Sequence, residues 1–104
     1  MNDSASNDWK VEIPMGSRSG HISYHEGASV ASFYWEFGGG DVIAIIYIGQ
    51  PSEWSKKHPW AANRRHEILD RMIWEVIHQR APTCKADTDE KAGYVYLREQ
   101  KPAA

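Results

Sequence analysis

The sequence predicts one small α+β domain in which a meandering antiparallel sheet of about six strands packs on one long amphipathic helix. Three observations lead to this prediction. Short segments in both halves of the chain alternate apolar with polar residues, which is the period of a half-buried strand. One longer segment, 61–80, changes to helical spacing. The length of 104 residues suits a single domain, and the proportions of 41% apolar and 25% charged residues are those of an ordinary globular protein.

Two strands are expected near the start of the chain. In 9–13 the apolar residues alternate strictly with charged ones. In 21–26 the alternation returns, with two apolar residues on one face and His21, Ser23 and His25 on the other. Proline and glycines separate the two segments, which favours a loop between them.

Two further strands and a hairpin follow. The segment 29–37 is rich in β-branched and aromatic residues, which favour strands. The segment 42–48 is almost continuously apolar, which predicts a central strand covered on both faces. Three glycines and an aspartate at 38–41 are expected to connect the two strands as a hairpin.

The helix is expected over 61–80, with Pro59 near its start and Pro82 after its end. A short turn is expected to precede it at 52–55. Two more strands, 83–87 and 93–98, then complete the order β-β-β-β-α-β-β. The apolar stripe of the helix consists of Ile68, Leu69, Met72, Ile73, Val76 and Ile77.

The domain is expected to span 9–100, because 1–8 and 101–104 lack apolar periodicity and are typical of disordered tails. Within it, the widths of the two layers do not match. A six-stranded sheet is about 29 Å wide at about 4.8 Å per strand, and one helix is only about 10 Å across. We therefore expect the sheet either to curl into a half-barrel or to meet a second copy of the chain.

The overall charge and composition exclude several classes of protein. A net charge of −2 argues against a dedicated nucleic-acid binder, whose domain normally carries a basic excess. The longest apolar run is far shorter than the roughly 20 residues of a membrane helix. The start of the chain is polar and acidic, unlike a signal peptide, and a single cysteine allows no disulfide within the chain. A cytoplasmic location is therefore expected.

The outer side of the helix carries a first group of candidate binding residues. Projection at roughly 100° per residue places Trp74 opposite the apolar stripe, next to Arg71 and His78, with Trp60 on the same side. An exposed tryptophan is typical of interaction surfaces. The alternative is that Trp74 lies flat along the helix, stacked on Arg71 and His78.

The face of the sheet that points away from the helix carries a second group of candidates. If Ile22, Phe33, Trp35, Val95 and Leu97 point toward the helix, the opposite face receives polar and aromatic side chains. These are His21, His25, Tyr34, Glu36, Tyr94 and Tyr96. On a curved sheet they could line a ligand pocket with acid and base groups, and the alternative is a half-wet face on which the rings lie flat.

A third group, at the start of the helix, is basic. Lys56, Lys57, Arg64 and Arg65 have no acidic residue between them, and the free amides of a helix N-terminus also favour anions. They could hold a phosphate, a carboxylate or a nucleic-acid backbone. The alternative is a solvated basic edge, with Arg65 reaching past the sheet to escape the apolar stripe.

No catalytic residue, metal site or cofactor is predicted. His21 and His25 lie about 13 Å apart along one strand, too far to bind one ion. Cys84 follows a helix C-terminus, which disfavours a thiolate, and is expected to be a buried structural residue.

The leading hypothesis is a non-catalytic binding or protein-interaction module, as a homodimer or with another protein, that uses the helix aromatics or the uncovered sheet face. A small ligand-binding domain or enzyme with a pocket of His, Tyr and Glu is the alternative from another class. Weak binding of an anion or single-stranded nucleic acid at the basic group is the third.

Overall fold

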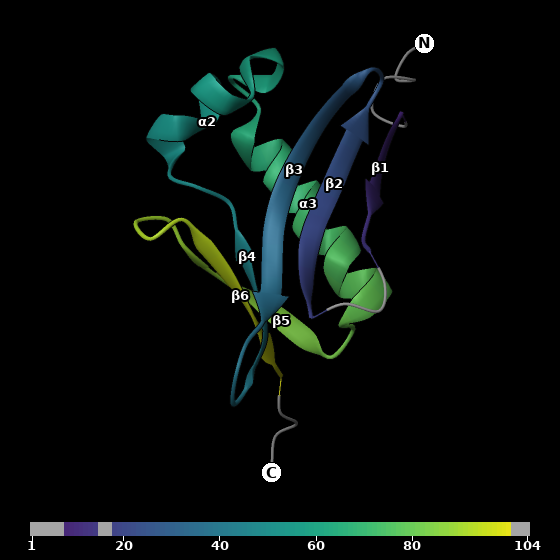
Figure 1. Ribbon diagram of the computed structural model, residues 1–104, viewed down its shortest axis with the longest axis vertical. Helices are drawn as coiled ribbons and strands as arrows, with labels where there is room; N and C mark the ends of the chain where they lie inside the picture. The colour runs from purple at the N-terminus through teal and green to yellow at the C-terminus, as the bar shows by residue number, and fades with distance from the viewer. Residues whose placement is uncertain (1–7, 15–17, 101–104) are drawn as a thin grey trace.

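The structure is a computed structural model that describes residues 8–14 and 18–100. Most residues of the expected tails, 1–7 and 101–104, lie outside the described residues. The elements are, in chain order, β1 (Trp9–Glu12), β2 (Ser19–Glu26), β3 (Ser29–Phe37), β4 (Val42–Tyr47), α2 (Pro51–Lys57), the 3₁₀-helix η1 (Pro59–Ala61), α3 (Arg65–Arg80), β5 (Cys84–Asp89) and β6 (Tyr94–Glu99) (Figure 1).

The described strands form one antiparallel sheet of six strands in the order β1-β2-β3-β4-β6-β5. The first four strands follow one another as a meander, and β6 lies between β4 and the edge strand β5. At the centre, Ile46 of β4 is opposite Val95 of β6. The predicted fold class, with the long helix between the fourth and fifth strands, is confirmed.

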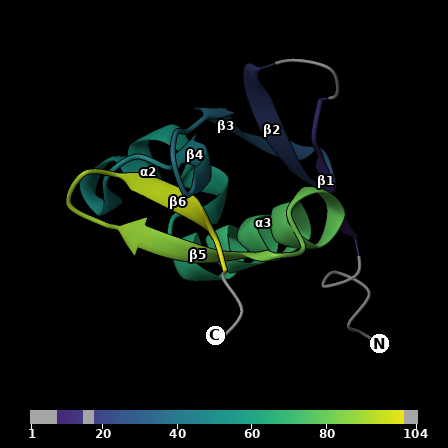
Figure 2. The same cartoon turned by 90° about the horizontal axis from the view of Figure 1, so that it is seen from below.

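The sheet curls around α3 instead of lying flat against it. Seen from below, β1, β2 and β3 lie above the helix, while β6 and β5 pass on its other side (Figure 2). The curl gives the sheet a concave face, which holds α3, and a convex face, which α3 does not reach. The curl also explains how one narrow helix can cover a six-stranded sheet. A curved sheet surrounds the helix, whereas a flat sheet of the same width would extend beyond it.

The hydrophobic core lies between the concave face and α3. The five strand residues that we expected to point toward the helix, Ile22, Phe33, Trp35, Val95 and Leu97, are all buried. The helix contributes Ile68, Leu69, Met72 and Val76 from its apolar stripe. Since a fully buried aliphatic or aromatic side chain of this size contributes about 1.5–3 kcal/mol, this layer accounts for most of the hydrophobic stabilisation.

The start of α3 differs from the prediction, because the helix begins at Arg65 and not at Ala61. Pro59–Ala61 forms the separate turn η1, and the backbone of Arg64 is not helical, with φ −124° and ψ 24°. The indole of Trp54 donates a hydrogen bond of 2.7 Å to the carbonyl oxygen of Ala61. The carbonyl oxygen of Ala61 therefore takes part in a tertiary contact. The helical periodicity of the sequence does not reveal such a contact.

The turn expected at 52–55 is longer than predicted and forms α2, with Pro51 at its first position. Its buried residue, Trp54, stacks on Phe33 with 6.3 Å between the ring centroids. Strands β3 and β4 pair only between Trp35–Phe37 and Ala44–Ile46. Beyond that short ladder the strands separate, and Trp54 packs against Phe33 where the pairing has ended.

The prediction that 42–48 is covered on both faces was wrong. Ala44 and Ile46 of β4 are buried, while Ile45 and Tyr47, which point to the opposite face, are only partly buried. The helix and α2 supply apolar partners on the concave side only, so the convex side of this strand stays open to solvent.

The last hairpin is shifted by one or two residues from the predicted ranges. Asp89 ends β5, and its side chain accepts a hydrogen bond from the amide of Ala92. Gly93 has φ +81°, a conformation that L side chains rarely adopt, and a Cβ there would lie 2.9 Å from the backbone carbon of Gly49. Gly93 therefore fixes the position of the turn, because another residue would be strained in this conformation and too close to Gly49.

Candidate functional site

The convex face of the sheet is the candidate functional site. Because successive residues of a strand point to opposite faces, the neighbours of the core residues on β2, β3, β4 and β6 all point outward here. The central ones are His21, Tyr34, Glu36, Tyr47, Tyr94 and Tyr96. They come from four adjacent strands, so they form a continuous surface.

Four tyrosines cross this face from β3 to β6, and we call them the tyrosine ladder: Tyr34, Tyr47, Tyr94 and Tyr96. Their ring centroids are separated by 5.3 Å, 4.8 Å and 6.1 Å in that order. Each neighbouring pair is tilted or edge-on, which is the favourable arrangement of aromatic rings. These contacts between neighbouring rings hold the rings in place.

Glu36 lies beside the ladder and joins two of its members. Its carboxylate accepts hydrogen bonds from the hydroxyl of Tyr34 at 3.2 Å and from that of Tyr47 at 3.1 Å. The hydrogen bond to Glu36 and, to a lesser extent, burial raise the pKa of Tyr47. Among the described residues, no cationic side chain forms an ion pair with Glu36.

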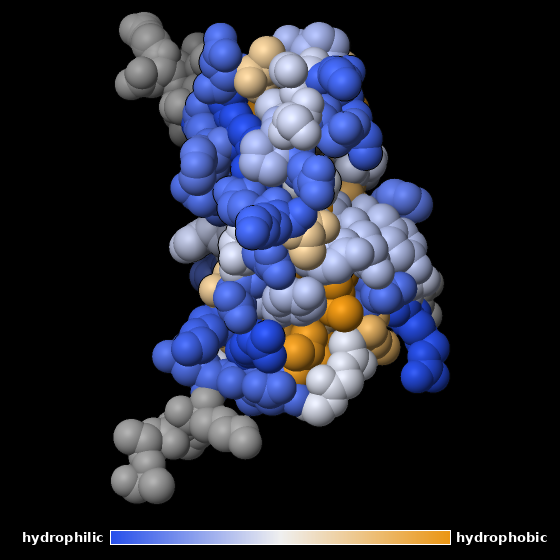
Figure 3. Space-filling model, turned by 90° about the vertical axis from the view of Figure 1, so that its left-hand side faces the viewer, coloured by the Kyte–Doolittle hydropathy of each residue, from blue (hydrophilic) through white to orange (hydrophobic). Residues whose placement is uncertain are grey.

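The two ends of the ladder are polar. At one end the ring of His21 meets Tyr34 edge-on, with 5.6 Å between centroids. At the other the guanidinium of Arg98 lies 5.3 Å from the ring centroid of Tyr96 and forms an ion pair with Asp87. On the side that carries α2, β4 and the last hairpin, an orange apolar patch lies in the lower part of the view, with pale side chains to its right and above it and blue polar groups on the left (Figure 3).

An open hollow of about 630 Å³ adjoins the ladder on the side of α2. Tyr34, Tyr47 and Tyr94 line it from the sheet, and Glu53 and His58 line it from α2 and its C-terminal end. Burial and then the nearby charge of Lys57 lower the pKa of His58, so its ring is neutral at pH 7. The hollow leaves open space next to the rings.

Tyr47, the central member of the ladder, was absent from the predicted site residues. It is the last residue of β4 and lies next to the end of the apolar run 42–48, which we had interpreted as buried throughout. The signal that could have revealed it is the alternation at its end, since Ile46 is buried and Tyr47 must therefore point to the other face.

Of the six sheet-face candidates, the structure brings five together and leaves one apart. His21, Tyr34, Glu36, Tyr94 and Tyr96 all belong to the ladder or contact it. His25 lies on the same face, but its ring nitrogen is 2.8 Å from the carboxylate of Glu12 on the edge strand.

The outer face of α3 holds a smaller aromatic feature. Trp74 is 58% exposed and stacks on His78, with 4.7 Å between centroids and 11° between ring planes. Trp60 is not part of it, because η1 directs its ring onto Tyr24. Arg71 also turns away, and its guanidinium lies 5.1 Å from the ring centroid of Trp9.

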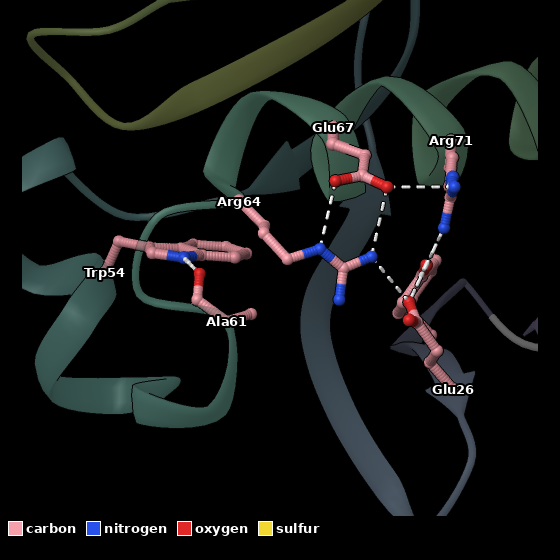
Figure 4. Close-up of polar contacts among 7 residues, drawn as sticks. Glu26, Trp54, Ala61, Arg64, Glu67 and Arg71 are labelled. Atoms are coloured by element: carbon pink, nitrogen blue, oxygen red, sulfur yellow. Dashed lines mark hydrogen bonds and ion pairs between the residues drawn. The ribbon is translucent and has the colours of Figure 1, made fainter. Parts of the chain in front are cut away.

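Two of the four basic candidates, Arg64 and Arg65, are paired with acids. Arg64 donates to both oxygens of Glu67 and, at 3.0 Å, to Glu26; Arg71 pairs with Glu67 at 2.9 Å (Figure 4). Glu26, at the end of β2, also accepts a 2.6 Å hydrogen bond from Tyr24. The cluster ties β2 to the start of α3.

Arg65 does not reach past the sheet into solvent, because its side chain is only 11% exposed and finds a carboxylate. Its guanidinium pairs with Glu90 at 2.8 Å and donates to the carbonyl oxygen of Gly49. Of the predicted anion site, Lys56 and Lys57 remain as exposed cations on α2. The four basic residues are therefore not directed to a common ligand.

Three other findings concern chemistry outside the ladder. No group of three or more His, Cys, Asp or Glu in the described part of the chain is placed to hold a metal ion. Cys84 is buried, and burial raises the pKa of its thiol. None of the helices in 8–14 and 18–100 has the length and apolar character needed to cross a membrane.

Comparisons with protein-family models, with curated proteins and with solved structures found no match to this chain.

Proposed function

We propose that this protein is a non-catalytic interaction module that binds a protein partner through the tyrosine ladder and that a cationic side chain of the partner pairs with Glu36. The observation that carries the proposal is a carboxylate in the middle of an aromatic surface, hydrogen-bonded by two phenols and paired with no cation among the described residues.

The ladder is suited to binding because its rings are already ordered. Tyrosine buries a large apolar area and has few rotatable bonds, so it loses little conformational freedom when a partner covers it. Tyr34 and Tyr47 are further fixed by their shared acceptor, Glu36. A partner therefore gains contact area without ordering the surface first.

The chemistry of the ladder favours a cation over an anion. The faces of aromatic rings attract arginine and lysine, and desolvation strengthens that attraction. A guanidinium can at the same time donate to a carboxylate such as that of Glu36. Covering this carboxylate with a neutral or acidic partner would leave a buried charge without compensation, which is costly.

A peptide titration tests the proposal. We expect a five-residue peptide with one central arginine to shift the ring resonances of Tyr34, Tyr47 and Tyr94 saturably, because its guanidinium contacts them. The same peptide with citrulline, which keeps the shape and loses the charge, should bind at least fivefold more weakly. Equal shifts from both peptides would exclude a cation-selective ladder.

Matched variants of the protein make the test specific. Glu36→Gln should weaken the arginine peptide about fivefold or more, since it removes the charge and keeps an acceptor. Asp70→Asn removes the same charge from the exposed outer side of α3 and should leave binding unchanged. If both variants bind like the parent, Glu36 has no part in recognition.

Sedimentation measurements test whether the partner is a second copy of the chain. Self-association at high micromolar concentration that Glu36→Gln abolishes would identify a homodimer through the ladder. A monomer under those conditions leaves a different protein as the partner.

We propose a cytoplasmic location for the protein, because its lone, buried Cys84 is compatible with a reducing compartment.

A further inference from the structure

A second surface feature lies on the opposite face of the sheet, at the end of the core that the last turn of α3 does not fill. It is a pocket of about 430 Å³, within the range of about 300–1,000 Å³ that is usual for small-molecule sites. Ile22, Ile46, Val76 and Leu97 are among the core residues that line it. Its wall is therefore largely apolar.

The rim of the pocket is apolar as well. Phe37 is 52% exposed and Ile43 is 41% exposed, although both belong to the sheet and line the pocket. Large apolar side chains at the mouth of an apolar pocket increase the contact area available to a ligand that enters it. They also leave the mouth open to water in the absence of a ligand.

One polar group within the wall of the pocket has no partner among the described residues. Trp35 is only 9% exposed and lines the pocket, and its indole N–H makes no hydrogen bond there. The nitrogen lies next to Gly20, its partner across β2 and β3, at 3.4 Å from the position that a Cβ would take. The nitrogen itself has almost no accessible surface, so a ligand oxygen reaches it only when the ring of Pro14 moves aside. A buried donor without an acceptor is costly, and such a contact would relieve that cost.

Two arginines line the pocket. Arg80 donates to the carbonyl oxygens of Ile13 and Pro14 at 3.3 Å and 3.4 Å, and the ring of Pro14 in turn approaches Gly20 beside the indole of Trp35. Arg18 also lines the pocket. Neither arginine pairs with a carboxylate in the described residues, and no acidic side chain lines the pocket.

We infer that this pocket binds a small amphipathic carboxylate, with its apolar body among the core residues and its carboxylate between Arg18, Arg80 and the indole N–H of Trp35. The apolar wall favours a ligand with an apolar body, and the two arginines with one buried N–H donor favour a ligand with a negatively charged head. The inference is independent of the proposed function, since the pocket lies on the concave side and the tyrosine ladder on the convex side.

A titration with three probes of one chain length tests the inference. Octanoate should shift the methyl resonances of Ile46, Val76 and Leu97 and the indole N–H resonance of Trp35 saturably. Octanol has the same apolar body without charge and should bind about tenfold more weakly. Octylammonium has the opposite charge and should bind more weakly still. Absence of saturable shifts with octanoate, or equal affinity for all three probes, would overturn the inference.

Variants separate the roles of the polar groups. Replacing both arginines, Arg18→Gln with Arg80→Gln, should weaken octanoate about tenfold or more and leave octanol unchanged. Trp35→Phe keeps an aromatic ring, removes the donor and should weaken octanoate by several-fold, read from the methyl resonances.

Lys56→Gln with Lys57→Gln removes the same two charges from α2, away from the pocket, and should bind octanoate like the parent. If the double arginine variant also binds like the parent, the anionic head does not lie where we place it. Because its side chains are exposed, that variant should fold normally, and unchanged methyl resonances before titration will establish this.

Discussion

Two glutamates of this protein accept hydrogen bonds from tyrosines, yet their surroundings differ. Glu26 bonds to Tyr24 and also to Arg64 and Arg71, and its side chain is only 16% exposed. Glu36 bonds to two tyrosines on the open face of the sheet, and no ion pair to it is present in the described residues. The first carboxylate is neutralised within the fold, whereas the second has capacity left for a partner.

A glutamate that accepts a hydrogen bond from a tyrosine can therefore belong to a neutralised cluster within the fold, as Glu26 does, or to an open surface, as Glu36 does. A carboxylate that must be covered during folding needs its cations from the same chain, since burying it alone is costly. A carboxylate on an uncovered face is hydrated in the free protein and can exchange water for a cation of another molecule. Removing Glu26 should therefore affect stability, and removing Glu36 should affect binding.

The largest expected effect is on stability. Glu26→Gln should lower the free energy of unfolding by about 2 kcal/mol, because Arg64 and Arg71 then share Glu67 alone in a partly exposed site. Urea denaturation measures the change. The matched variant Glu36→Gln should leave the free energy of unfolding within error of the parent. Equal losses in the two variants would remove the distinction between the glutamates.

The next effect is on the pH dependence of stability. Burial raises the pKa of Glu26, but hydrogen bonds from Arg64 and Tyr24 and the charges of both arginines outweigh it, so the net pKa lies below the usual 4.5. Arg64 likewise holds down the pKa of Glu67. A carboxyl with a lowered pKa in the folded state stabilises the protein above about pH 4.5, and this contribution is lost as the pH falls through the folded-state value.

We therefore expect the free energy of unfolding of the parent to decrease from about pH 5 downward, and that of Glu26→Gln to decrease less steeply. Denaturation at a series of pH values measures both slopes. Glu36→Gln is the control and should keep the slope of the parent. Parallel curves for the parent and Glu26→Gln would show that the arginines do not hold the Glu26 carboxylate in its charged form.

A smaller effect on stability is expected to distinguish Tyr24 from Tyr47. Tyr24→Phe should lower the free energy of unfolding by about 1 kcal/mol, because the buried hydroxyl bonds Glu26 at 2.6 Å and accepts from Arg71 at 2.9 Å. Tyr47→Phe removes a hydroxyl from the open face and should not change stability measurably. Chemical denaturation of both variants tests this, and a larger loss for Tyr47→Phe would contradict it.

The smallest expected effect is on phenol titration. Burial, and then the bond to Glu26, raise the pKa of Tyr24 to about 12, and the bond to Glu36 raises that of Tyr47. Glu36→Gln should move the pKa of Tyr47 back toward its usual 10.0 and leave Tyr24 unchanged. Site-resolved ring resonances followed to high pH measure both groups. No change at Tyr47 would mean that the carboxylate does not control its hydroxyl.

The orientation of most strand residues could be predicted from local sequence, because it depends only on alternation. Ile22, Phe33 and Leu97 are buried as expected. The prediction failed at β4, where a continuous apolar run hid the alternation and Tyr47 was missed. It also failed at the start of α3, because the carbonyl of Ala61 is bonded by Trp54 from another element.

The candidate sites were only partly predictable, for a related reason. Sequence spacing grouped Arg64 and Arg65 as an anion site, but their acids arrive from elsewhere in the chain, Glu26 from the end of β2 and Glu90 from the last hairpin. The pocket at the end of the core had no sequence signal, since its polar groups, Arg18, Trp35 and Arg80, are far apart in the chain and carry no common motif.

By itself, the sequence determined the strand and helix periods, the fold class and the face on which each alternating residue lies, because these follow from the geometry of a few neighbouring residues. Only the tertiary structure decided that the sheet curls, that Tyr34, Tyr47, Tyr94 and Tyr96 meet in one row, and that Glu26 has arginine partners while Glu36 has two phenols. Those outcomes depend on strand register and curvature, which place residues from distant segments within bonding distance.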